Sequence, residues 1–400
     1  MFSNPDMVRQ LMYLSERKPV EGAISDWCDA SYLAELRETN VVVDGEKLPH
    51  KYFSQPTDLA LAFSSDGVLI NGRRGGPSTS PMVMQIMNLH PDRRTHREFS
   101  LRLGNIGGPK APRNMHSYEA PLDEELVELA RGVPTYNALT GEIFILRAYN
   151  IYKFGDMRSM EKFLNTKGAS SPDACWTCSQ TGFLHPEQTI YFAALAKPTN
   201  TGIKGRSWPA ANPPIRTEED YRIACEKIAN APTRAFKESL QKHFGINGPP
   251  SMRRVGSMDR PRSYATDLMH MIPENVIPNL VKLITGTFKG LDDGHENYEL
   301  GEELMDEVFI ETGRAMKTIP SAFVRNLAGG PTKFPAEGWL FWFTHMAPGL
   351  LQGRLPSKYH THLCALAKII KTCLEPSLTH ERINELELEI VDWALEKYEE

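Results

Sequence analysis

Two aspartates in this sequence stand where apolar, strand-like runs end. The run "LALAFSSDGVLI", residues 59–70, meets Asp66 and Gly67 after an alternation of large and small apolar residues, and "GEIFILRAYNIYKFGD", residues 141–156, ends on Asp156. Asp-Gly is a common turn dipeptide, so either aspartate is a turn residue or a metal ligand. Carboxylates are the ligands that Mg²⁺ prefers beside substrate phosphates, and two such ions assist in-line displacement at a phosphodiester. The chemistry to consider is therefore metal-assisted cleavage and transfer of DNA strands.

The cysteine pair "CWTC", Cys175 and Cys178, has the spacing with which two thiolates approach one zinc ion. Two further ligands are required, for which His185, Cys225 and His243 are candidates. A redox pair, or two ordinary thiols, is the alternative.

A third candidate is "DLMH", in which Asp267 and His270 stand one helical turn apart and face one side. Metal ligation and proton transfer both suit this pair. The alternative is an aspartate at a helix start and a histidine with a purely structural role.

Arginines gather in three short clusters, although the net charge of −5 gives no support for nucleic-acid binding over the whole surface. Each cluster is either a solvated loop or a local contact to phosphate. The arginines predicted to contact DNA are Arg73, Arg74, Arg93, Arg94, Arg253 and Arg254, with Arg97, Arg260 and Arg262 close by in the sequence.

The elements that must position the two aspartates follow in a recognisable order. The runs 58–65, 81–89 and 97–106 predict three strands joined by Gly-, Pro- and charge-bearing loops, which is typical of an antiparallel meander. Residues 120–133 predict an amphipathic helix that ends at Gly132, and residues 141–156 predict a fourth, buried strand. We expect an α/β fold with a ribonuclease-H-like mixed sheet. By analogy with that architecture, Asp66 and Asp156 become neighbours.

Length and composition favour a globular, several-part chain. The 400 residues, 41% of them hydrophobic, are enough for a large core. No apolar run is long enough to span a membrane, and six scattered cysteines favour a reducing compartment, cytoplasm or nucleus. The predicted parts are a helical lead-in (1–50), the core (51–160), a loop-rich insertion with the cysteine pair (161–265), and a helical region (266–400) in which the core remains incomplete.

Taken together, these segments resemble the transposases of CACTA (En/Spm-like) DNA transposons, in particular the fungal branch, from end to end. The stretches that carry the resemblance are "VVVDGEKLPHKYFSQPTDLALAFSSDG", "GGPKAPRN", "GEIFILRAYNIYKFGDM", "CWTC", "YATDLMHMIPENVIPNLVKLITGTFKGLDDG" and "IPSAF".

The resemblance implies a DDE-type catalytic core with Asp66 as the first acid and Asp156 as the second, and with Asp267 as the alternative second acid. It also implies Mg²⁺ or Mn²⁺ as cofactor, transposon-end DNA as partner and the nucleus as location. Cys175 and Cys178 match the family's paired cysteines, and Asp267 and His270 match its Asp-x-Met-His element. Zinc binding and a homo-oligomeric state stay open.

Two departures qualify this expectation. Arg158 and Ser159 stand where such sequences commonly have Pro-Ala, and no segment here matches the late helix that carries the third acid, a Glu. We therefore expect a transposase that is inactive or incomplete as given, with a non-catalytic, transposon-derived DNA-binding or interaction protein as the alternative. A zinc-dependent hydrolase built on Cys175, Cys178 and His270 is a third, weaker hypothesis.

Overall fold

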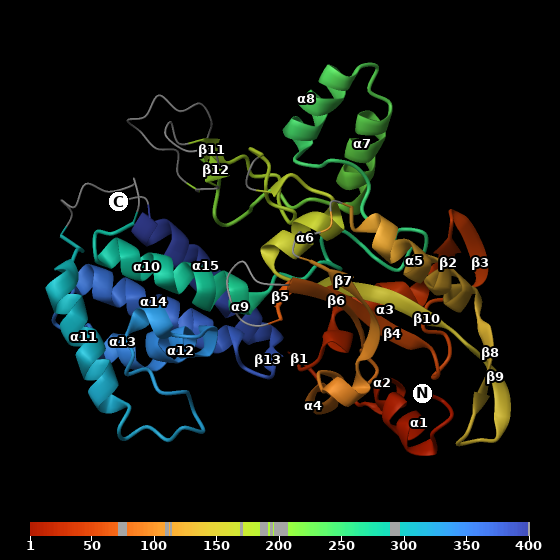
Figure 1. Ribbon diagram of the computed structural model, residues 1–400, viewed down its shortest axis with the longest axis horizontal. Helices are drawn as coiled ribbons and strands as arrows, with labels where there is room; N and C mark the ends of the chain where they lie inside the picture. The colour runs from red at the N-terminus through yellow and green to blue at the C-terminus, as the bar shows by residue number, and fades with distance from the viewer. Residues whose placement is uncertain are drawn as a thin grey trace. The chain divides into compact units, whose positions relative to one another are not determined.

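The computed structural model divides the chain into two compact units, Met1–Ala265 and Thr266–Glu400 (Figure 1). It describes residues 1–70, 78–108, 112, 114–168, 171–184, 191–192, 195, 207–288 and 297–398. Each unit is described below by itself.

A mixed five-stranded sheet forms the centre of the first unit. Its strands are β4 (Leu59–Ser65), β5 (Val68–Leu69), β6 (Ser78–Ile86), β7 (Leu101–Gly107) and β10 (Ala148–Phe154). β6 pairs antiparallel with β4, β5 and β7, and β10 pairs parallel with β4 on its other side. The antiparallel meander and the α/β class are thus confirmed. β4 lies inside the sheet with nearly every residue buried, which explains its unbroken apolar run.

The prediction of a single strand over residues 141–156 is wrong in one respect, because the chain forms two strands there. β9 (Glu142–Leu146) pairs antiparallel with β8 (Val133–Asn137) in a separate hairpin, and Arg147 parts it from β10. Ile143 and Ile145 of β9 are 66% and 43% exposed. Their apolar character made the run look uniformly buried, whereas only β10 enters the core.

Helices cover both faces of the sheet (Figure 1). On one face lie α5 (His116–Arg131), which ends at Gly132 as predicted, and α6 (Met157–Leu164), whose Phe163 ring lies 5.5 Å from that of Phe63 on β4. On the other face, Trp27 of the short helix η1 (Trp27–Asp29) meets Tyr152 of β10 with ring centroids 6.1 Å apart. The strand ends of β4 and β10 are therefore held between two packed layers.

The first 50 residues contain short helices followed by a hairpin. The hairpin strands β2 (Asn40–Val43) and β3 (Glu46–Lys51) pair antiparallel, and the fully buried Val41 and Val43 join the core of the first unit. The other elements of this unit are α1 (Pro5–Leu11), α2 (Tyr13–Glu16), β1 (Ala23–Ile24), α3 (Ser31–Glu38), α4 (Pro91–Arg94), η2 (Arg97–Phe99), β11 (Phe183–Leu184), β12 (Tyr191–Phe192), α7 (Glu218–Ala229) and α8 (Arg234–Phe244).

The second unit is mostly helical and has its own apolar core around Trp342, which is 1% exposed and donates from Nε1 to Thr312 Oγ1 at 3.0 Å. Among the described residues no helix is both long and apolar enough to cross a bilayer. The elements of the second unit are α9 (Leu268–Met271), the π-helical turn η4 (Ile272–Val276), α10 (Ile277–Ile284), α11 (Gly301–Ala315), η5 (Pro331–Lys333), α12 (Ala336–Phe341), the π-helical turn η6 (Trp342–Met346), α13 (Ala347–Leu350), α14 (Ser357–Cys373), β13 (Leu378–Thr379) and α15 (His380–Tyr398).

Candidate functional site

Asp66 and Asp156 follow the ends of two neighbouring parallel strands. Phe154 of β10 pairs with Ser64 of β4, and each aspartate stands two residues beyond its strand partner. The register shifts by one between Asn150 and Tyr152. Because of this bulge, Asp156 continues the register opposite Asp66. Without the bulge, Gly155 would be the residue opposite Asp66, and the two aspartates would be offset by one residue.

Gly155 shows how closely these strand ends approach. A Cβ added there would lie 2.8 Å from Ser159 Cβ and 3.6 Å from the carbonyl oxygen of Ser65. Contacts below 3.0 Å are not tolerated between real side chains, so this position requires glycine. The residues directly before the two aspartates are thus in contact range.

Each aspartate also makes a local hydrogen bond. Asp66 is exposed and its Oδ1 accepts from the backbone N–H of Gly67 at 2.6 Å. Asp156 is half-buried and caps α6, with its Oδ1 accepting from the backbone N–H of Ser159 at 2.6 Å. Within the described part of the chain, the second oxygen of each carboxylate has no hydrogen-bond partner.

The two carboxylates suit a hard divalent ion in chemistry and position. Mg²⁺ is commonly bound through one or two carboxylates, with water and substrate phosphates completing its shell. Strands in a sheet lie about 4.8 Å apart, so the backbones that carry the two aspartates are close enough for a shared ion. The residues that the structure describes contain no group of three or more His, Cys, Asp or Glu side chains arranged to hold a metal. Asp66 and Asp156 fit as a partial ligand set.

Beneath this strand end lies a buried ion pair for which the sequence offers no direct signal. Lys153 on β10 and Glu119 on α5 are 0% and 1% exposed, and Lys153 Nζ lies 2.9 Å from Glu119 Oε2. Lys153 also donates to Ser251 Oγ at 2.7 Å, and its charge lies over the rings of Phe63 and Phe163. Burial lowers the pKa of Lys153, and Glu119 opposes that shift. The pair joins α5 to the strand that carries Asp156.

Asp267 and His270 belong to the second unit and are linked as the spacing predicts. Asp267 caps α9 by accepting from the backbone N–H groups of Met269 and His270. Its Oδ2 lies 2.8 Å from His270 Nδ1, and His270 Nε2 lies 3.8 Å from Glu274 Oε2. The carboxylate therefore orients the imidazole, while the role of Asp267 as alternative second acid stays a prediction.

Cys175 and Cys178 form a compact turn with unequal thiols. The backbone N–H of Cys178 donates to Cys175 Sγ at 3.4 Å, and the buried Arg216 binds the carbonyl oxygen of Cys178 at 3.0 Å. Hydrogen bonding from the Cys178 thiol lowers the pKa of Cys175 to about 6, and the same interaction raises the pKa of Cys178. The predicted zinc ligand His185 lies outside the described residues.

The arginines predicted to contact DNA have different surroundings. Arg73 and Arg74 lie outside the described residues. Arg94 is buried and paired with Asp26 at 2.6 Å, and Arg254 forms a two-point pair with Asp44 at 2.8 Å. Arg253 is exposed and has no ion-pair or hydrogen-bond partner within the ranges that the structure describes.

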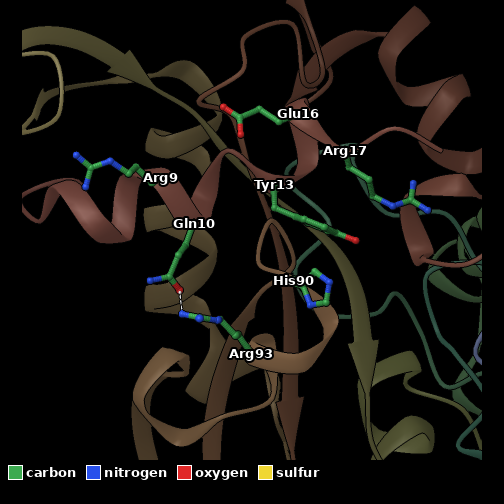
Figure 2. A pocket seen from close by; sticks show the side chains of 7 residues that line it. All are labelled: Arg9, Gln10, Tyr13, Glu16, Arg17, His90 and Arg93. Carbon is green, nitrogen blue, oxygen red and sulfur yellow. Dashed lines mark hydrogen bonds between the residues drawn. The ribbon is translucent and has the colours of Figure 1, made fainter.

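Arg93 lines a pocket of about 350 Å³ between α1, α2 and the turn before α4. Figure 2 shows its hydrogen bond to Gln10, 3.0 Å long, and the ring of His90 beside that of Tyr13. Ile86, at the end of β6, pairs with Leu61 near the start of β4. Because Leu61 and Asp66 are separated by about 15 Å of strand, this pocket lies at the end of β4 away from Asp66.

The first unit is thus a mixed α/β domain with two carboxylates at neighbouring strand ends. Within it, residues 43–194 match the model of a family described as Transposase family tnp2. The matched segment contains Asp66, Asp156, Cys175 and Cys178, and it supports a transposase role with DNA as partner. No curated protein matches the chain.

Proposed function

We propose that this protein is a DDE-type DNA transposase of the fungal CACTA group. Such transposases cleave and transfer DNA strands at transposon ends in the nucleus; this chain supplies Asp66 and Asp156 as two of the metal-binding acids, and no match to the third acid, a Glu, is found among its residues, so the catalytic set is incomplete as given. The observation that carries the proposal is the parallel pairing of Phe154 with Ser64, which brings the two acids to adjacent strand ends. The transposase family match over the same residues supports it.

The strand order supports a ribonuclease-H-like core. The three long antiparallel strands β4, β6 and β7 are followed by α5 and, after the separate β8–β9 hairpin, by β10, which lies beside β4 and parallel to it. This is the order expected of that architecture, in which ligands gather at the ends of the central strands. Of the elements involved, β4 delivers Asp66, β10 delivers Asp156, and α6 begins directly at the site.

The chemistry assigned to the site is displacement at a phosphodiester. Mg²⁺ or Mn²⁺ bound there would neutralise phosphate charge and activate the attacking oxygen. The chain's own contribution is to fix two negative groups at one strand edge. The cap bond to Ser159 and the bond to Gly67 hold one oxygen of each carboxylate and leave the other directed to a ligand.

A second candidate function is DNA binding without cleavage. The observation that favours it is that Asp66 and Asp156 each satisfy a backbone N–H in their own turn, a structural role that requires no metal.

A strand-nicking assay separates the two functions. Supercoiled plasmid carrying the cognate transposon ends is incubated with the full chain and Mg²⁺ or Mn²⁺. If the two acids found here suffice for nicking, Asp66→Asn and Asp156→Asn should each lower its rate at least about 100-fold, because each removes a charge that stabilises the bound ion. Asp92→Asn is the matched control, since Asp92 is 86% exposed and lies on α4, near the other end of β4. Salt-sensitive DNA binding without nicking would support the second function instead.

A further inference from the structure

A second pocket, of about 510 Å³, opens beside α6 on the side of the sheet covered by α5 and α6. Its lining includes His116, Arg158, Lys162, Asn165, Thr166 and Asn247. Arg158 stands two residues after Asp156 in the first turn of α6, so the pocket begins next to the candidate metal site.

Two basic side chains of this pocket have no acidic partner among the described residues. Arg158 and Lys162 stand four residues apart on α6, both are exposed, and neither has an ion-pair or hydrogen-bond partner in the described ranges. Like charges at this spacing repel each other and destabilise the helix. Some exposed basic side chains of the unit are paired, as in Arg222 with Glu226 and Arg262 with Glu35, whereas others, such as Arg253, have no partner in the described ranges. An anion bound between Arg158 and Lys162 would relieve the repulsion.

Two polar atoms of the lining are buried without partners in the described part of the chain, His116 Nε2 and Thr166 Oγ1. Buried polar groups almost always have a hydrogen-bond partner, and both of these residues belong to the lining of the cavity. Burial lowers the pKa of His116, and the nearby charges of Lys153 and Arg253 lower it further, against the opposing effect of Glu119.

The part of the lining that directly follows α6 is held by hydrogen bonds to backbone carbonyl oxygens. Asn247 donates from its backbone N–H to Asn165 O at 2.7 Å and from Nδ2 to Thr166 O at 2.8 Å, and Asn165 Nδ2 donates to Pro249 O at 3.2 Å. The one acid of the lining, Glu161, is turned against Gly168, where an added Cβ would lie 2.0 Å from its Oε1. The pocket is thus preorganised, and its free charges are positive.

We propose that this pocket binds a backbone phosphate of a DNA strand, next to the phosphodiester that lies at Asp66 and Asp156. The inference rests on the proposed function for the identity of the ligand. Arg158 and Lys162 supply the charge, and His116 and Thr166 supply neutral hydrogen bonds. Such contacts fix the register of a strand without reading its sequence. Arg158 and Lys162 are positioning residues rather than catalytic ones.

The test compares two double variants of the full chain. Arg158→Gln/Lys162→Gln removes the pocket's charge, and Lys237→Gln/Lys242→Gln removes the same charge from exposed positions of α8. Binding of a labelled single strand and of its duplex is measured by fluorescence anisotropy from about 50 to about 200 mM KCl. For the pocket variant we expect affinity to fall about 10-fold and the slope of log K against log[KCl] to become shallower by about 0.7 for the single strand and about 0.9 for the duplex, as for the loss of one phosphate contact. An equal change in both variants, or none in the pocket variant, overturns the proposal.

A second readout distinguishes DNA from a free anion. The ring resonances of His116 are followed by NMR while oligonucleotide or inorganic phosphate is added at equal phosphate concentration. A shift with DNA alone, or a stronger shift with DNA, supports the proposal, whereas a response to inorganic phosphate alone overturns it.

The nicking assay separates this inference from the proposed function. Pocket-dependent DNA binding without nicking by the wild-type chain contradicts the proposed catalysis and leaves the pocket assignment intact. Nicking by the wild-type chain together with unchanged DNA binding by the pocket variant contradicts the pocket assignment alone.

Discussion

Lys153 and Glu119 form an ion pair with no exposure to solvent, 2.9 Å between Nζ and Oε2, beneath the strand end that carries Asp156. The pair spans β10 and α5, and Ser251 accepts a further hydrogen bond from Lys153. Charges removed this completely from water are tolerated only while they remain paired. The position of β10 at the candidate site therefore depends on both partners.

We predict that breaking this pair destabilises the first unit more than replacing it. Lys153→Met leaves the Glu119 carboxylate buried alone, and Glu119→Gln leaves the Lys153 ammonium alone. Each single change should lower the free energy of unfolding by about 3–5 kcal/mol. The loss of unfolding free energy in the double variant should be smaller than the sum of the two single losses, because no unpaired charge remains. Hydrogen exchange of the β4 and β10 amides in urea reports this unit specifically, and strict additivity of the two losses would contradict the coupling.

Asp156 carries two roles that substitution can separate. Asn caps a helix about as well as Asp does, whereas Ala does not cap it. We expect Asp156→Ala to lower the free energy of unfolding by about 1 kcal/mol and Asp156→Asn to cost only a few tenths, since Asn retains the hydrogen bond to the Ser159 N–H. Both variants remove the charge, so both should lose metal-dependent nicking. If Asn and Ala destabilise α6 equally, as judged by urea unfolding, the cap bond contributes nothing.

Much of the sheet was predictable from local patterns, because burial on both faces selects the apolar runs that became β4 and β10. The antiparallel order also followed from short, turn-bearing loops. Two features depend on contacts that no local pattern contains. Exposure of Ile143 and Ile145 made residues 142–146 a separate hairpin strand, and the register shift after Asn150 set which residues meet across β10 and β4.

The candidate site was predictable only in part, for a related reason. Asp66 and Asp156 were found because each ends a strand. The arginine clusters were less informative, since residues distant in the sequence decide whether an arginine is paired or free to contact DNA. Arg94 meets Asp26 and Arg254 meets Asp44, across 68 and 210 residues of sequence. Arg158 stood out in the sequence only because, with Ser159, it replaces Pro-Ala, and Lys162 did not stand out at all; within the described ranges both lie unpaired beside a pocket.

The cysteine pair makes a testable prediction about reactivity. The thiolate is the reactive form, so Cys175, with its pKa lowered to about 6, should be alkylated by iodoacetamide at neutral pH far faster than Cys178, whose pKa is raised. The pH profile of the Cys175 rate, followed by mass spectrometry, should have its midpoint near 6. Cys178→Ala removes the hydrogen-bond donor and should move that midpoint upward toward the ordinary thiol range. An unchanged midpoint would contradict the hydrogen bond as the cause.

The same experiment tests zinc binding by this pair, which we propose for Cys175 and Cys178. Zn²⁺ bound by both thiolates should suppress alkylation of both cysteines and release protons on binding. The Cys373→Ser variant serves as a control for thiol loss, since Cys373 is exposed on α14 of the second unit. Alkylation rates that do not respond to Zn²⁺ would exclude the pair as a zinc site.

Asp58 gives the first unit a pH dependence whose sign is opposite to that of most carboxylates. Its side chain is 1% exposed, Oδ2 accepts from the backbone N–H of Gln55 at 3.1 Å, and Oδ1 has no partner in the described part of the chain. Burial raises the pKa of Asp58 from 3.8 to about 6, and the Gln55 N–H and the charge of Arg147 oppose the shift. Between these two pH values the folded state binds more protons than the unfolded state does. The contribution of Asp58 to the free energy of unfolding is therefore largest below about pH 4 and falls as pH rises toward 7.

We predict that Asp58→Asn removes the decrease in the free energy of unfolding that Asp58 causes as pH rises, because an amide does not titrate. The variant's free energy of unfolding minus that of the wild-type chain should rise by about 2–3 kcal/mol between about pH 4 and pH 7. Taking the difference cancels groups that act in the other direction, such as Asp29, whose pKa the Arg17 guanidinium lowers to about 2. Urea unfolding across this range measures the difference, and Asp92→Asn controls for the loss of one negative charge. A difference that stays flat would mean that Asp58 titrates alike in both states and that its burial costs the fold nothing at neutral pH.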